Sequence, residues 1–597
     1  MANGFGSLYI GAAGLQSASN ALNVTSNNMA NVNTTGYVRQ QVLNVDRNYV
    51  TFDTTSAISD QQSGLGVKIG DVVHARDIFL DKSYRTESGR QAFYAATYEA
   101  LEEVYTFYQE LEGEAFQDSL EDFWTSFQEL AKAPDDSVNQ NLVVQKANLF
   151  ISRAAAVYGG FQEYQSNINT QINDDIDRIN ELGETIFELN LQIQSVESAH
   201  VETAMTLRDE RDNALDELAS LIDISYKEDV NGIVKVKCEG IDFVDESRVY
   251  NIGKQIDPLS GFITPYWEHL SDPANDKYDE VFSFTTEISS ELGTDIGELK
   301  SLLLARGDRA ANYTDIVGLS SKEYNHSTAD QIATGTSIML QAEAQLDQLV
   351  HGIITAINDL LCPNTTAGEL GAVQSGGTIK AYDANGKVYR ITEDTLLLDT
   401  ENCSTGADGE FPPTELFVRI GTERYTEVTA VTGKDADGKD IVSTFYVYNE
   451  EDPNDTAKQY TVHSVSVNEA LKEQETLLPH LRQDGSVNYE LAEQLATAWD
   501  VEGLTIDPDD TNKVCFMDYY NNMVGAFGTL GSVYYSTSTS LAATVTSVDN
   551  QRTQVIGVST DEELAKMIKY QNAYNASSRF INVINEMIEH LVTKLGA

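Results

Sequence analysis

The sequence predicts a mainly α-helical protein with β-rich insertions: the terminal helices pair as a coiled coil, and a long helical bundle carries two inserted β-rich modules. Three observations predict this fold class. Apolar side chains recur at alternating steps of three and four residues at both ends of the chain, and residues 168–196 keep that spacing in the interior. Two internal stretches instead contain short β-favouring runs separated by Gly, Asp and Pro.

The first 38 residues contain no charged side chain, although the whole chain is strongly acidic. Their heptad seam consists of Phe5, Leu8, Ala12, Leu15, Ser19, Leu22, Ser26 and Met29. A similar seam near the other end consists of Leu564, Ile568, Gln571, Tyr574, Ser578, Ile581, Ile588, Leu591 and Leu595. A heptad seam keeps one face of a helix against a partner, so we expect the two ends to pair with each other.

Spacing and turn residues divide the chain between these ends. We expect a terminal coiled-coil domain at 1–36 and 557–597, an extended or β connector at 37–90, a helical bundle domain at 91–222, 297–362 and 516–556, a first β-rich insertion at 223–296 and a second at 363–515. Pro134 ends one bundle helix. A very long helical stretch is expected from 138 to 222, and Gly159-Gly160 and Gly183 are its candidate break points.

Two interior features of that long stretch have an ordinary structural interpretation. The seam at 168–196 is expected to be bundle core rather than an interface between subunits. The charged cluster at 208–212 is expected to form solvated ion pairs, with contacts between subunits as the alternative.

The four cysteines are too few and too scattered for a disulfide framework, and none forms a Cys-x-x-Cys pair. Cys362 and Cys515 stand where the second β-rich insertion leaves and re-enters the bundle, so we expect them to lie near each other. A disulfide needs Cα atoms within about 7 Å, and the sequence leaves open whether these two are bonded.

Composition excludes some classes of partner. The formal net charge is −54, from 39 basic and 93 acidic residues, and such a surface repels nucleic acid and anionic membranes. No window approaches about 18 consecutive apolar residues, so no membrane span is expected. The opening residues lack the basic region of a secretory signal peptide, which predicts a cytosolic protein unless export uses a route without a cleaved signal.

The sequence shows no clear catalytic, cofactor or metal motif. The segment 64–70, GLGVKIG, lacks the third glycine of a dinucleotide-binding loop and is interpreted as a turn. The sequence contains no Gly-Lys-Ser/Thr phosphate loop, no His-Glu-x-x-His motif and no Gly-x-Ser-x-Gly elbow. We therefore expect no enzyme activity, no catalytic residues, no cofactor and no metal site.

Both ends resemble a known family. The stretch 30–40, ANVNTTGYVRQ, carries the signature residues Asn31, Asn33, Gly36, Tyr37, Arg39 and Gln40. It resembles the N-terminal signature of the flagellar axial proteins of the rod–hook group, and residues 557–592 resemble the matching C-terminal signature. The inner segments LRDERDNALDELA (207–219) and GELKSLLLARGD (297–308) are closest to the hook-associated protein 1 branch, the first hook–filament junction proteins.

This resemblance implies a structural subunit of the bacterial flagellum that joins hook to filament and supports filament assembly and motility. It implies secretion through the flagellar type III export route without a cleaved signal peptide. The implied partners are further copies of the chain in a ring, the hook protein, the second junction protein (hook-associated protein 3) and an export chaperone, with no nucleic acid and no membrane. The apolar residues of the two terminal seams would then form the assembly interface. The alternatives are a hook or distal-rod subunit, or an adhesin role carried by residues 363–515.

Overall fold

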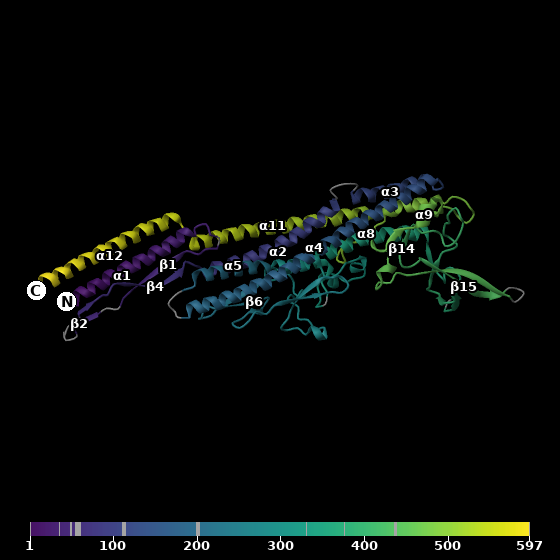
Figure 1. The fold of residues 1–597 in the computed structure, drawn as a ribbon. Helices are drawn as coiled ribbons and strands as arrows, with labels where there is room; N and C mark the ends of the chain where they lie inside the picture. The colour runs from purple at the N-terminus through teal and green to yellow at the C-terminus, as the bar shows by residue number, and fades with distance from the viewer. Residues whose placement is uncertain are drawn as a thin grey trace.

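The protein is elongated, and its two chain ends lie together at one end (Figure 1). The computed structural model describes residues 2–34, 36–47, 50–53, 61–109, 115–198, 203–329, 331–374, 376–434 and 439–595. The helices are α1 (Ala2–Ala30), α2 (Ile78–Gln109), α3 (Phe116–Lys132), α4 (Ser137–Glu197), α5 (Met205–Leu221), α6 (Glu298–Arg306), α7 (Ser321–Asn325), α8 (Ile338–Leu361), α9 (Glu469–Glu473), α10 (Tyr489–Thr497), α11 (Phe516–Ile556) and α12 (Thr560–Leu595). The predicted fold class, helical with β-rich insertions, is confirmed.

The strands fall into groups that follow the chain order. They are β1 (Gln40–Asp46), β2 (Val50–Asp53), β3 (Gln61–Ser63), β4 (Val67–His74), β5 (Ile224–Glu228), β6 (Val234–Cys238), β7 (Ile241–Val244), β8 (Ile252–Ile256), β9 (Ile263–Trp267), β10 (Asn364–Thr366), β11 (Thr378–Tyr382), β12 (Val388–Thr392), β13 (Leu396–Leu398), β14 (Phe417–Arg419), β15 (Tyr425–Lys434), β16 (Asp440–Tyr448) and β17 (Val465–Val467). The largest sheet among the described residues has the order β10-β13-β16-β15-β11-β12. Its long β15–β16 hairpin projects from the long helical bundle of α2, α4, α5, α8 and α11, which we call the rod (Figure 1).

The terminal unit contains α1, α12 and the antiparallel pair β1–β4. The register of that pair runs from Gln40↔His74 to Asp46↔Val67. Helix α1 packs against α12 and also against β1 and β4. The Ser17 hydroxyl, for example, donates to Asn44 Oδ1 at 3.0 Å. The N-terminal helix therefore has a partner on two sides, and α12 packs mainly on α1.

The rod differs from its predicted layout at both ends of the first bundle segment. Helix α2 begins at Ile78, so residues 78–90 belong to the rod and not to the extended connector expected at 37–90. The long helix expected from 138 to 222 is two helices, α4 and α5, and α5 packs back on α4. The reversal buries the apolar side of α5, including Leu215 and Leu218.

The glycines expected to break this stretch lie inside α4, which continues through them. A Cβ on Gly160 would lie 2.9 Å from the Phe107 ring of α2, and one on Gly183 would lie 2.5 Å from the Phe243 ring of the first β-rich insertion. These two glycines permit close packing of neighbouring elements, and the helix continues through them.

The interior seam of α4 is core, since Ile168, Ile172, Ile179 and Ile193 are buried. The main cluster of buried apolar side chains continues from α4 into both β-rich modules. All four cysteines are free thiols, so Cys362 and Cys515 are not bonded, and the Cys362 thiol donates to the Pro413 carbonyl at 3.4 Å. Within the described residues, none of the helices combines the length and the apolar character needed to cross a membrane.

Candidate assembly interface

The contact between α1 and α12 uses small side chains rather than the predicted leucines. A Cβ on Gly11 would lie 2.8 Å from Ile581 Cγ1, and one on Gly14 would lie 2.9 Å from the Ser577 hydroxyl. The other buried residues of α1 are small or polar and include Ala13, Ser17, Ala18, Ala21, Thr25 and Asn28. Of these, Ser17 bonds Asn44 of β1 and Ala13 lies beside Gly66, so the buried side of α1 faces the β1–β4 pair as well as α12, and the leucine seam is less buried than either contact.

The predicted seam lies beside this contact and is only partly covered. Leu8, Leu15, Leu22 and Met29 are half-buried, as are Ile581 and Ile588. The more exposed members are Leu564 (41%), Ile568 (59%), Tyr574 (37%) and Leu591 (49%). The side chain of Phe5 lies outside the described residues.

Further apolar side chains of α12 extend this surface toward the chain end. They are Phe580, Val583, Met587 and Val592, each at least 42% exposed. Scattered exposed apolar residues are normal on a protein surface, but a continuous group along one helix marks a surface that another molecule covers. The terminal unit therefore exposes a series of apolar side chains along α12 that the described residues do not cover.

The signature residues form the joint between this unit and the rod. The buried Asn28 amide accepts from the Gln40 backbone N–H at 3.0 Å and donates to the Gln40 carbonyl at 3.0 Å. The same amide donates to Glu563 Oε2 of α12 at 3.1 Å and accepts from the Tyr37 hydroxyl at 2.9 Å. Arg39 pairs with Glu562 at 3.1 Å, so this segment ties α1 to the start of α12.

The remaining signature residues shape the turn after α1. The Asn31 side chain donates to the Asn27 carbonyl at 3.0 Å, and Asn33 is exposed. Gly36 has φ +75°, and a Cβ there would lie 2.2 Å from the Asn213 side chain of α5. Position 36 therefore requires glycine for two reasons: its backbone is left-handed, and a side chain would collide with the rod.

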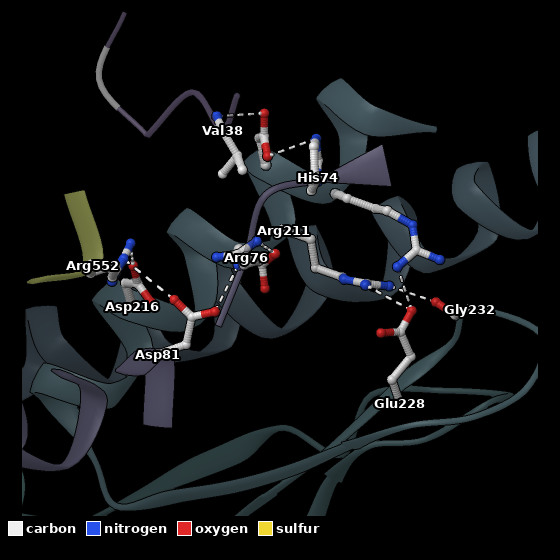
Figure 2. A network of polar contacts seen from close by, with 12 residues as sticks. Val38, His74, Arg76, Asp81, Arg211, Asp216, Glu228, Gly232 and Arg552 are labelled. Atoms are coloured by element: carbon white, nitrogen blue, oxygen red, sulfur yellow. Dashed lines mark hydrogen bonds and ion pairs between the residues drawn. The ribbon is translucent and has the colours of Figure 1, made fainter. Parts of the chain in front are cut away.

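A buried polar network continues from this joint into the rod (Figure 2). The Val38 backbone N–H donates to Asp209 Oδ2 at 3.2 Å, and Arg76 bonds Asp81 at 2.7 Å and also pairs with Asp212. Arg552, near the end of α11, pairs with Asp216 at 2.5 Å and Asp81 at 3.4 Å. Three distant parts of the chain thus meet at one set of charges.

The expectation of solvated ion pairs at 208–212 is wrong for its central residues, because Asp209 is 5% exposed and Arg211 is 2% exposed. Arg211 donates to Asn190 Oδ1 at 3.0 Å and to the Gly232 carbonyl at 2.6 Å. The reversal at α5 places Asp209 and Arg211 between α4, β5 and the connector strands, where little solvent reaches them, whereas Glu210 of the same cluster stays exposed.

Burial also sets the protonation state of His74 in this network. His74 Nε2 lies 3.4 Å from Asp209 Oδ1. Burial, with the nearby Arg76 and Arg208, lowers the pKa of His74 to about 4, and burial raises the pKa of Asp209 to about 7. The imidazole is therefore uncharged at neutral pH, and this contact is not an ion pair there.

Known flagellar proteins are similar to this chain in sequence. The family model described as flagellar hook-associated protein FlgK helical domain matches residues 101–372. The chain is 23% identical to flagellar hook-associated protein 1 of Bacillus subtilis over 589 residues, covering 96% of this chain and 95% of that one. It is 20% identical to flagellar hook-associated protein 1 of Escherichia coli over 583 residues, covering 97% and 98%.

The chain belongs to the flagellar hook-associated protein 1 family.

Two further family models match the ends. The flagella basal body rod protein model matches residues 8–37, and the C-terminal model of the flagellar basal body rod FlgEFG proteins matches residues 552–593. The structure of the flagellar hook junction protein FlgK from Burkholderia pseudomallei matches with a TM-score of 0.45 and 12% identity, covering 79% of this chain and 99% of that one. The matched ends are the segments that form the terminal unit and its joint.

Sequence reasoning missed several residues of the joint between the terminal unit and the rod. They are Asn28, His74, Arg76, Asp81, Arg85, Asp216, Arg552 and Glu563. One signal was available, since Arg552 is an isolated cation in a helix that is otherwise nearly free of charge, next to the C-terminal signature. Its acceptors, far away in sequence, could not be inferred from it.

Replacing Asn28 with alanine is expected to lower the free energy of unfolding by about 2 kcal/mol, because the buried N–H and carbonyl of Gln40 then lose their partner. Faster hydrogen exchange at the Gln40 amide would measure this loss. Asn20→Ala, at an exposed position of the same helix, is the matched control and should leave that amide unchanged. Equal exchange in the two variants would contradict the assignment.

Proposed function

We propose that this chain is a structural subunit of the bacterial flagellum that joins the hook to the filament and supports filament assembly and motility. The observation that carries the proposal is the terminal unit: paired terminal helices at one end of a rod, with apolar side chains left uncovered along α12. The near-complete coverage of hook-associated protein 1 relatives supports the same function. The family is one of flagellar structural proteins.

The match to the helical domain favours the junction over a hook or distal-rod subunit. The models of basal body rod proteins match only the two ends, whereas the hook-associated model matches 101–372. That range contains the α4–α5 hairpin and the first β-rich module. These elements distinguish this chain from a minimal axial subunit that consists of the terminal unit and a connector.

Neighbouring copies would cover the seam residues of α1 and α12. Each exposed leucine or isoleucine that becomes buried contributes about 1.5–3 kcal/mol. The described part of α1 has no charged side chain, so copies can line up around a ring without placing like charges together. The ends matched by axial family models are the same residues, which supports their use in assembly.

The proposed function also implies a route of export and a set of partners. The chain would leave the cell through the flagellar export route without a cleaved signal peptide. It would contact the hook protein on one side and hook-associated protein 3 on the other, and a chaperone would hold it before export. The large acidic surface suits the exposed part of a structure that stands in water.

Replacing Ile581 with aspartate tests this function. The half-buried Ile581 contacts Gly11, and a charge there costs more in a covered seam than in a free chain, so incorporation at the hook tip should fall at least about tenfold. Immunoblots of purified hook–filament structures and swimming assays would measure it. Ile420→Asp, at a 69% exposed isoleucine of the second β-rich module, is the matched control. Normal filaments from the Ile581 variant would exclude the proposed interface.

Deleting the protein tests the junction function independently of any substitution. Cells without it should release filament subunits into the medium instead of assembling them, because the acceptor surface for the filament is missing. Filaments of normal length on such cells would refute the proposal.

A further inference from the structure

The six-stranded sheet of the second β-rich module has one buried face and one open face. Side chains of the buried face pack with Ala367 and Val373 in a separate apolar cluster, and they include Ala381, Ile391, Val428, Ala430 and Phe445. Neighbouring residues of a strand point to opposite faces of a sheet, so the residues on either side of these point away from that cluster. They form an open face on β11, β12, β15 and β16.

The register of the strands arranges the side chains of this open face in two adjacent rows. The first row follows the pairs Tyr382↔Val388, Tyr382↔Thr429 and Thr429↔Thr444 across the strands. The second row lies two residues further along each strand and contains Arg390, Lys380, Val431 and Val442. Neighbouring side chains on one face of an antiparallel sheet contact one another, so the two rows form one continuous surface.

Half of the side chains in these rows are apolar or aromatic. Tyr382 is 47% exposed and Val388 is 52% exposed in the first row, and Val431 is 52% exposed and Val442 is 60% exposed in the second. Tyr382 lies beside Val388, and Val431 pairs with Val442. Single exposed apolar residues are normal, but apolar side chains in adjacent positions mark a surface that another molecule covers, and tyrosine is enriched in such surfaces.

Two cations lie in the same surface without a counter-charge. Lys380 and Arg390 are paired directly across β11 and β12, and both are exposed. Among the described residues, neither forms an ion pair or a side-chain hydrogen bond. The chain has 93 acidic against 39 basic residues, yet Glu427, which shares this face, lies on the far side of the first row. Like charges directly opposite each other destabilise a sheet, and a carboxylate from a partner would remove that cost.

We propose that this open face binds an acidic segment of another protein chain, whose carboxylates pair with Lys380 and Arg390 and whose apolar side chains cover Tyr382, Val388, Val431 and Val442. The unpaired cations call for carboxylates and the exposed valines call for apolar side chains, and a protein segment supplies both. The β15–β16 hairpin projects from the rod (Figure 1), so this contact lies beside the rod and away from the seam of the terminal helices. The inference goes beyond the proposed junction function and does not depend on it.

Nucleic acid and anionic lipid fit this face less well than an acidic protein segment. Their binding needs several Lys or Arg contacts with phosphates, whereas this face has two cations in a chain of net charge −54. At physiological ionic strength, screening over about 8 Å confines the repulsion from the remote acidic surface. Two carboxylates in direct contact with the cations are still attracted.

A library of random peptides displayed on phage can show which chemistry the open face binds. The library is selected on the purified full-length chain and counter-selected on the Tyr382→Ser variant. We expect the retained peptides to contain more Asp and Glu than Lys and Arg, together with apolar residues. Their dissociation constants, measured by fluorescence anisotropy, should rise at least about tenfold in Tyr382→Ser. Tyr489→Ser, at a 55% exposed tyrosine of α10 in the same module, is the matched control.

Replacing Lys380 with glutamate separates binding from folding. The substitution places a carboxylate opposite Arg390, so the thermal unfolding temperature should stay the same or rise. The selected peptides should nevertheless bind at least about tenfold more weakly, because one cation is lost and a like charge faces their carboxylates. Lys322→Glu, at an exposed lysine of α7, should leave their affinity unchanged. Added salt should weaken binding to the unsubstituted chain.

The inference is overturned if the selection yields no peptides, or peptides that are neutral or basic, or peptides that bind the Lys380 and Tyr382 variants as well as the unsubstituted chain. Binding of DNA or phosphatidylglycerol vesicles that Lys380→Glu abolishes would also overturn it. In purified hook–filament structures, a photoreactive benzoyl-phenylalanine in place of Tyr382 should crosslink to an acidic segment of a neighbouring chain. No crosslink from incorporated chains, or one to a basic segment, would contradict the inference and leave the proposed function intact. A chain that is never incorporated would refute the proposed function, and the peptide selection would still decide the inference.

Discussion

Replacing Arg552 with alanine is expected to lower the free energy of unfolding at the joint by about 3–4 kcal/mol. Arg552 is 7% exposed, and its guanidinium lies between the carboxylates of Asp81 and Asp216 and 4.5 Å from the centre of the Tyr84 ring. Without Arg552, Asp81 keeps only Arg76 and Asp216 keeps only Arg85, so two carboxylates at a site that little solvent reaches each lose one cation. Hydrogen exchange along α5 and the end of α11 would measure the loss.

An exposed arginine provides the control for this prediction. Arg178 pairs with Glu181 at 2.5 Å and Glu217 at 2.6 Å, but its side chain is 43% exposed. Arg178→Ala should therefore cost less than about 1 kcal/mol. Arg552→Lys should recover only part of the loss, because an ammonium cannot span two carboxylates and stack on a ring as a guanidinium does. Similar losses at 552 and 178 would mean that the joint is not stabilised by its buried charges.

The Arg552 contacts also explain a limit of the sequence-based predictions. Apolar spacing located the helices well, and α11 covers the same residues as the predicted bundle segment 516–556. The acceptors of Arg552 lie 336 and more residues earlier in the chain, and only the folded topology brings them together. The charged cluster of α5 likewise needs the reversal after α4 before it becomes buried, so its composition alone predicted solvated pairs.

The terminal unit shows a different limit. Counting apolar residues favoured the leucine seam of α1, but side chains of α12, Ile581 and Ser577, pack where Gly11 and Gly14 leave room. Helix pairing depends on shape as well as on hydrophobicity, and glycine has no side chain to contribute to a pattern of apolar residues. The same residue type misled the prediction in α4, where Gly160 and Gly183 accommodate aromatic rings and do not interrupt the helix.

A buried carboxyl group on α8 gives the second large expected effect, which depends on pH. Glu343 is 0% exposed and accepts from the Ala311 N–H at 2.7 Å, and burial raises its pKa from its ordinary 4.5 to about 8. A raised pKa in the folded state means that the stability linked to this proton is fully present below pH 4.5 and is lost as pH rises through about 8. The loss above that pH is on the order of 5 kcal/mol.

Glu343→Gln should remove this pH dependence, because glutamine keeps the acceptor for Ala311 and has no proton to lose. At pH 6 the unsubstituted chain has already lost about 2 kcal/mol of this stability, because the carboxyl group of the unfolded chain is ionised above pH 4.5. The variant avoids that loss but itself costs up to about 1 kcal/mol, since its amide N–H₂ lies where Glu343 Oε1 has no hydrogen-bond partner among the described residues. At pH 6 we therefore expect the variant to be about 1 kcal/mol more stable than the unsubstituted chain. At pH 9 the variant should be more stable than the unsubstituted chain by about 3–5 kcal/mol. Urea unfolding at both pH values measures the difference, with the exposed Glu121→Gln as the matched control. If the Glu343 variant and the unsubstituted chain lost the same stability between pH 6 and 9, the titrating group would not be Glu343. The neighbouring Asp347 cannot account for a loss in that range, because burial raises its pKa only to about 6.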